Sequence, residues 1–131
     1  MSRTGVQSSL AATAAAAALA LLVGSGCSMS PTTACKEAAK ITCQRVYECF
    51  TSQERQSQPF IAAFGASETE CNTKLNSNNC SSVTDDKPCT DSTKKYYPDK
   101  AEACINDVKT SSCETIRQGT VPMGNCDAVC M

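Results

Sequence analysis

The chain of 131 residues contains no histidine and no tryptophan, and it has only three phenylalanines and three tyrosines. The absence of histidine excludes a Ser-His-Asp triad, a Cys-His catalytic pair and every histidine-ligated metal site. With so few aromatic rings, the chain has little apolar surface from which to build a large core. The composition therefore argues against the commonest hydrolase sites and against an ordinary well-packed domain.

Two further absences narrow the functional classes. No two cysteines are spaced as Cys-x-x-Cys, which is the spacing of thioredoxin-like redox sites and of ordinary zinc pairs. The closest pair, Cys126 and Cys130, fits a structural disulfide role better than a metal. The formal net charge is −1, and no basic patch is present that would bind nucleic acid. We therefore expect no metal, no cofactor and no nucleic-acid partner.

The beginning of the chain predicts an export signal. Arg3 precedes an uncharged, mostly alanine run over 10–23, and small residues then lead to Cys27. The run has the length of a signal-peptide h-region, and it is shorter than the ~20 apolar residues of a membrane-spanning helix. We expect residues 1–26 to be removed, which leaves every cysteine in the remaining chain. The alternative is a disordered alanine-rich tail.

The chain has 11 cysteines, and this density in a short exported protein is typical of a disulfide scaffold. A chain with a poor core needs such covalent support. Because 11 is odd, one cysteine requires another fate, such as lipidation or an intermolecular bridge. Cys27 alone lies at the export boundary. The expected disulfide framework then consists of Cys35, Cys43, Cys49, Cys71, Cys80, Cys89, Cys104, Cys113, Cys126 and Cys130.

Hydrophobic periodicity predicts an all-α fold, a small loop-rich domain of three to five short helices over 34–131. The first helix is expected over 34–50, and its apolar face carries Cys35, Cys43 and Cys49. These cysteines lie about 12 and 9 Å apart along the helix axis, at 1.5 Å per residue. They are therefore too far apart to bond one another, and each is expected to reach a different segment.

Shorter helical segments are expected farther along the chain. A short apolar piece over 59–65 precedes a capping box at 67–70, whose helix is expected to end in the asparagine-rich run before Cys80. Residues 81–96 are expected to form a loop. Another helix begins at Pro98, a favoured residue for a first helical turn, and one more helical turn and a loop tail follow it.

Carboxylates are numerous but scattered, and helix starts or neighbouring arginines explain most of them. A glycosidase-like acid pair is a weaker alternative, because so small a scaffold leaves little room for a substrate cleft. Tyr96 and Tyr97 are a second point of interest, since tyrosines serve recognition surfaces well. The alternative for them is a hydrophobic clamp at the start of the helix from Pro98. We expect no enzymatic activity.

A set of cysteines and their neighbours carries a family resemblance: CQRVYECF over 43–50, Phe64-Gly65, Cys71, Cys80, Ala103-Cys104, Ser112-Cys113, Pro122 and Cys126. Their spacing resembles that of a group of uncharacterised cysteine-rich bacterial lipoproteins and exported proteins. The resemblance covers nearly all of the chain after residue 26, and it implies an exported, disulfide-bonded, mainly helical domain without an assigned activity. Since Cys89 and Cys130 are additions to the group's pattern, the resemblance also implies that they pair with each other.

The same resemblance implies a membrane anchor at Cys27. In bacterial lipoproteins, the cysteine after a small-residue motif is diacylated on its sulfur, and signal peptidase II makes it the N-terminus. The run Gly24-Ser-Gly-Cys27 provides the small residues, with Gly24 where leucine is usual. Cleavage by the type I enzyme is therefore an alternative. Ser28 in place of an aspartate implies, by analogy with known sorting, the outer membrane.

The sequence thus predicts three segments: a lipoprotein signal peptide over 1–26, a lipidated tether over 27–33 and a cysteine-rich helical domain over 34–131. The favoured interpretation is a non-enzymatic, membrane-anchored lipoprotein of the bacterial cell envelope with a binding or structural role. Its expected partners are the membrane, through Cys27, and an envelope or cell-surface protein. The alternatives are a freely secreted disulfide-rich effector, such as an inhibitor or toxin-like module, and a small carboxylate hydrolase.

Reduction of the disulfides is expected to unfold the domain. Each disulfide typically stabilises a protein by about 2–4 kcal/mol, so five of them match the ~5–15 kcal/mol net stability of an ordinary domain. Circular dichroism of the protein with and without a thiol reductant measures the effect, and oxidised protein alkylated under the same conditions is the control. A reduced chain that keeps a cooperative thermal transition would contradict this expectation.

Overall fold

The computed structural model describes residues 28–131 of the chain. Cys27 and the expected signal peptide lie outside the described residues. The described part contains seven α-helices, one π-helical turn and no strand, and none of its helices combines the length and apolar character needed to cross a membrane. The expected all-α, loop-rich, disulfide-stapled fold is confirmed. Two of the seven helices are single four-residue turns, which leaves five helices of six residues or more.

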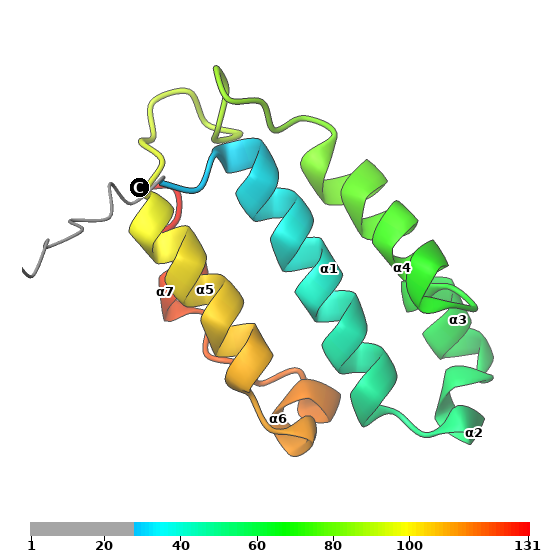
Figure 1. Ribbon diagram of the computed structural model, residues 1–131. Helices are drawn as coiled ribbons and strands as arrows, with labels where there is room; N and C mark the ends of the chain where they lie inside the picture. The colour runs from blue at the N-terminus through cyan, green and yellow to red at the C-terminus, as the bar shows by residue number, and fades with distance from the viewer. Residues whose placement is uncertain (1–27) are drawn as a thin grey trace, which may run out of the picture.

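The helices follow one another along the chain as α1 (Pro31–Cys49), α2 (Ser52–Arg55), α3 (Gln58–Phe64), α4 (Glu68–Leu75), the π-helical turn η1 (Asn76–Cys80), α5 (Pro98–Thr110), α6 (Cys113–Gln118) and α7 (Gly124–Asp127). In Figure 1, α1 lies in the middle, with α4 on one side and α5 on the other. The short α7 packs against α5, and the C-terminus returns to the end of the molecule where α1 begins.

The central helix α1 begins three residues earlier than expected. The Ser30 side chain accepts a hydrogen bond of 3.3 Å from the Thr33 amide, and Pro31 occupies the first turn. Ser30 is therefore the N-cap, since a cap side chain satisfies one of the free amides of the first turn and proline suits the position that follows. The helix start expected at about residue 34 was wrong, since α1 begins at Pro31.

Three disulfides join α1 to three different segments, as its spacing predicts. Cys35 bonds Cys80 at the end of η1, Cys43 bonds Cys71 in α4, and Cys49 bonds Cys113 at the start of α6. Cys43 and Cys71 are fully buried. The helix is thus linked covalently to its neighbours at its beginning, middle and end.

Two further disulfides hold the C-terminal part together. Cys104 of α5 bonds Cys126 of α7, and Cys89 of the loop after η1 bonds Cys130 of the tail. The second pairing is the one that the lipoprotein resemblance implied. The Cys126-x-x-x-Cys130 spacing is divided between two different bridges and does not form a metal pair.

Local structure departs from expectation in two places. Helix α2 was not expected; it forms because Thr51 and Glu54 make a reciprocal capping box between α1 and α3. The asparagine-rich run does not end helical winding but continues it as η1 up to Cys80. The Cys35–Cys80 bond holds that end against α1, and the Ser77 hydroxyl donates to the Thr73 carbonyl at 2.8 Å.

The core is made mostly of cystines and small aliphatic residues. Its buried members are Ala34, Ala39, Ile41, Cys43, Val46, Cys49, Phe60, Cys71, Cys80, Cys89 and Ala101. The one aromatic cluster lies at the far end of α1, where the buried Phe60 ring contacts Tyr47, Phe50 and Phe64 at centroid distances of 5.4, 5.3 and 5.1 Å. The opposite end, where α1 begins, contains no such cluster among the described residues.

Loss of the central bridge is expected to destabilise the domain more than loss of the bridge to the tail. The loop-entropy model places the Cys43–Cys71 and Cys89–Cys130 bridges within about 0.3 kcal/mol of each other, with the tail bridge slightly more stabilising. Truncation of two fully buried cysteines also leaves a cavity, which adds on the order of 1–2 kcal/mol. Guanidinium unfolding of C43A/C71A and C89A/C130A compares them, and a larger loss in the second variant would contradict the burial argument.

Candidate functional site

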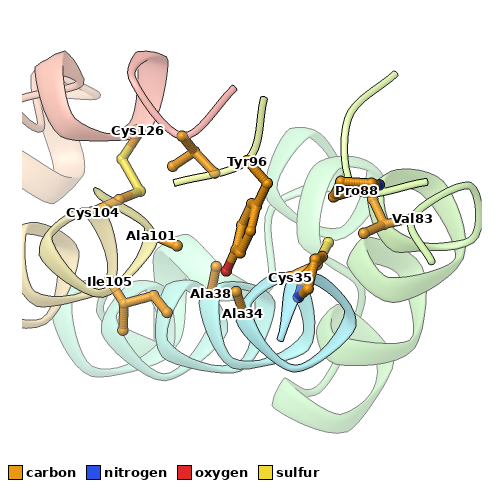
Figure 2. A pocket seen from close by; sticks show the side chains of 12 residues that line it. Ala34, Cys35, Ala38, Val83, Pro88, Tyr96, Ala101, Cys104, Ile105 and Cys126 are labelled. Atoms are coloured by element: carbon orange, nitrogen blue, oxygen red, sulfur yellow. A yellow bond between two sulfur atoms is a disulfide. The ribbon is translucent and has the colours of Figure 1, made fainter. Parts of the chain in front are cut away.

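An apolar cavity of about 220 Å³ lies between the first half of α1, α5, the loop that precedes α5, and the C-terminal tail. We call it the tyrosine cavity because Tyr96 stands in it (Figure 2). None of its lining side chains is charged. The residues that shape it include Ala34, Ala38, Val83, Ala101, Ile105 and Val129.

Small side chains on facing helices create this space. Ala34 and Ala38 are one turn apart on α1, and Ala101 and Ile105 are one turn apart on α5. Figure 2 shows the alanines of α1 facing the α5 side chains and the Cys104–Cys126 bridge. Alanine fills little volume, so the two helices pack without closing the space between them.

Tyr96 lines the cavity and also contacts Met29, which lies just before the beginning of α1. Its hydroxyl donates to the Met29 carbonyl at 3.0 Å, and in Figure 2 the phenol is directed towards α1 near Ala38. Burial, with smaller contributions from the Glu102 and Asp85 carboxylates, raises the pKa of Tyr96 above its ordinary value of 10.0. The phenol is therefore neutral in the physiological range, as the hydrogen bond to Met29 requires.

The C-terminal tail holds the backbone around Tyr96. The amides of Lys95 and Met131 each donate to the other residue's carbonyl, at 2.7 and 3.2 Å, and the Tyr97 amide donates to the Val129 carbonyl at 2.9 Å. Tyr96 and Cys130 form a single antiparallel bridge. The tyrosine is thus fixed from both sides, and of the two sequence interpretations it fits the clamp better than a free recognition surface.

The loop over 81–97 is also fastened to the start of α1. One oxygen of Asp85 accepts hydrogen bonds from the Thr32 hydroxyl and the Thr32 amide, at 2.9 and 3.3 Å. These bonds hold the pKa of Asp85 below its ordinary value of 3.8. Together with the Cys89–Cys130 bridge, they keep the loop over one side of the cavity.

A second apolar cavity, of about 370 Å³, adjoins the first. We call it the methionine cavity because Met123 lines it, together with side chains of α1, α3, α5 and α6. The two cavities share Ala38 and the bonded cysteines Cys104 and Cys126. They therefore follow one another along the side of α1 that faces α5.

Two acidic side chains, Glu48 and Glu54, lie in ion pairs and line neither cavity. Glu48 pairs with Arg45 on α1, and Glu54 pairs with Arg117 of α6, a partner too distant in sequence to foresee. Among residues 28–131, no group of three or more carboxylate or cysteine side chains is arranged to hold a metal ion. The chemistry that the cavities offer is binding of an apolar group.

The sequence matches no protein-family model, and no curated protein and no solved structure is significantly similar to it.

Acidification is expected to release Asp85 from Thr32 at the start of α1, while the disulfide and the Tyr96 hydrogen bond still hold the rest of the loop. A carboxyl group with a lowered folded-state pKa contributes stability above its ordinary value, here 3.8, and that contribution is lost as the pH falls towards the folded value. Hydrogen exchange of the Thr32 amide, followed by NMR, reports the contact.

The variant D85N is expected to speed exchange at Thr32 already at neutral pH, because it removes the charged acceptor. The matched control is D86N, which changes the neighbouring exposed carboxylate. Equal exchange rates in the two variants would show that Asp85 does not fasten the loop.

Proposed function

We propose that this protein is a non-enzymatic lipoprotein of the bacterial cell envelope, anchored through Cys27, and that its helical domain binds an apolar ligand next to the membrane. The observation that carries the proposal is the contact between Tyr96 and the Met29 carbonyl. Met29 is two residues after Cys27, and Tyr96 lines the apolar cavity. The hydrogen bond therefore joins the cavity wall to the chain next to the expected anchor. The exported, disulfide-bonded character that the lipoprotein resemblance implied agrees with this proposal.

The cysteine pairing supports both export and the special role of Cys27. All ten cysteines among residues 28–131 are bonded to one another in five disulfides. Such a number of structural disulfides is typical of oxidising compartments outside the cytosol. Cys27 is the one cysteine outside this framework, and it follows the small-residue motif over 24–26.

A short link supports a position close to the membrane. Consecutive Cα atoms are 3.80 Å apart, so Cys27 is at most about 7.6 Å from Met29 along the chain. Ser30 already caps α1. A lipid on Cys27 would therefore hold the beginning of α1, the 81–97 loop and the C-terminal tail near the bilayer surface. By the sorting analogy for Ser28, that bilayer is the outer membrane.

Intact mass spectrometry of the mature protein tests the anchor. We expect a chain that begins at Cys27 and carries a lipid-sized mass increment, because several acyl chains are needed for stable membrane attachment. The variant C27S is expected to lose the increment and to appear in the soluble fraction with its five disulfides intact. The variant S25A keeps a small residue in the motif and serves as the matched control.

An unmodified mature chain found in the growth medium would overturn the anchor. That result would instead support the freely secreted effector, and the cavities would then serve a ligand met outside the cell.

A further inference from the structure

We infer that one acyl chain carried by Cys27 folds back into the domain and lies in a channel formed by the tyrosine and methionine cavities. The inference rests on the proposed lipid anchor. It names the occupant of the cavities as part of the protein itself.

The two cavities together have the length of an acyl chain. Along α1, their wall runs from Pro31 to Val46, with Ala38 common to both. Fifteen residue steps at 1.5 Å correspond to about 22 Å. One leaflet of a bilayer hydrocarbon core is about 15 Å thick, which is the distance that one lipid chain spans. The combined wall along α1 is therefore long enough for an entire chain that passes Ala38 and the Cys104–Cys126 bridge, which both cavities share.

The wall is mostly hydrocarbon, and Tyr96 and Thr42 are its polar side chains. The lining side chains of both cavities are uncharged, and the Cys104–Cys126 sulfurs lie where the cavities meet. Both cavities are partly open to solvent, so a hydrocarbon that enters them displaces water from a mainly apolar wall. Each cavity also exceeds the roughly 150 Å³ that suffices for a benzene molecule. A linear hydrocarbon suits this wall better than a polar ligand does.

The covalent link to Cys27 favours this chain over other lipids. Met29 is held by the Tyr96 hydroxyl, so the lipidated residue is restricted to the neighbourhood of the tyrosine cavity. A tethered group reaches its site at an effective concentration in the millimolar range, and it loses little further translational freedom on binding. Because a lipoprotein carries more than one chain, the remaining chains can stay in the bilayer.

Photo-crosslinking tests the inference in intact membranes. Cells that express the full chain are supplied with a fatty acid bearing a diazirine near its methyl end, so that the group is incorporated into the lipids on Cys27. Irradiation and peptide mass spectrometry then locate the crosslinks. We expect the Cys27 lipopeptide to be joined to peptides of α1 or α5 that line the cavities.

A substitution in the shared wall provides a matched comparison. The variant A38F places a large side chain where the cavities meet and is expected to reduce the crosslink yield at least fivefold. The variant A63F makes the same change on the exposed surface of α3 and is expected to leave the yield unchanged. Disulfide mapping of both variants verifies that the framework has formed. If A38F does not assemble, A38L applies a smaller filling change at the same position.

Three results would overturn the inference, and they separate it from the proposed anchor. Crosslinks from the Cys27 lipid to bilayer lipids alone would show an anchored protein with an unoccupied channel. Labelled fatty acid attached to cavity residues, but not to the Cys27 peptide, would identify a separate lipid as the occupant. A Cys27 peptide without any lipid mass would remove the anchor and this inference together.

Discussion

The bonding of α1 at three points is the constraint on which the rest of the domain depends. Cys35, Cys43 and Cys49 are spaced along one helix face, so the segments that they bond must lie beside the beginning, the middle and the end of α1. In a chain without tryptophan, these bridges replace much of the apolar burial that orders helices in larger domains. The loops can then be long and polar without loss of the fold.

The covalent framework also explains how so small a domain tolerates open apolar space. The tyrosine cavity is partly open to solvent, so its apolar wall is exposed to water and is not an empty internal void. The bridges to η1, α4 and α6 fix α1, and the Cys104–Cys126 bridge fixes α7 to α5 beside this space. An apolar occupant would remove the exposed apolar wall from water.

Much of the fold follows from local sequence patterns, whereas the candidate site depends on long-range contacts. Helix faces place the α1 cysteines in one stripe and require three different partners, but periodicity does not say which cysteines those partners are. Ser30 and Thr33 are both good caps, and only the proline after Ser30 distinguishes them. The cavity could not be predicted, because it requires alanines on α1 and α5 to face each other across 60 or more residues of sequence. The Tyr96–Met29 contact spans a similar separation.

Different interactions hold the two ends of the domain together, and this difference bears on the proposed anchor at Cys27. At the far end of α1, the Phe60 ring contacts its aromatic neighbours, and three of these rings also line an open surface pocket of about 530 Å³. At the beginning of α1, the Cys89–Cys130 disulfide and the backbone hydrogen bonds between Lys95 and Met131 join the loop before α5 to the C-terminal tail. The Tyr96 hydroxyl joins the same loop to Met29, and apolar space remains between these segments. Hydrogen bonds and a disulfide fix the positions of these segments without filling the space between them. The end nearest Cys27 therefore offers apolar space that is bordered by Tyr96, the residue that holds Met29.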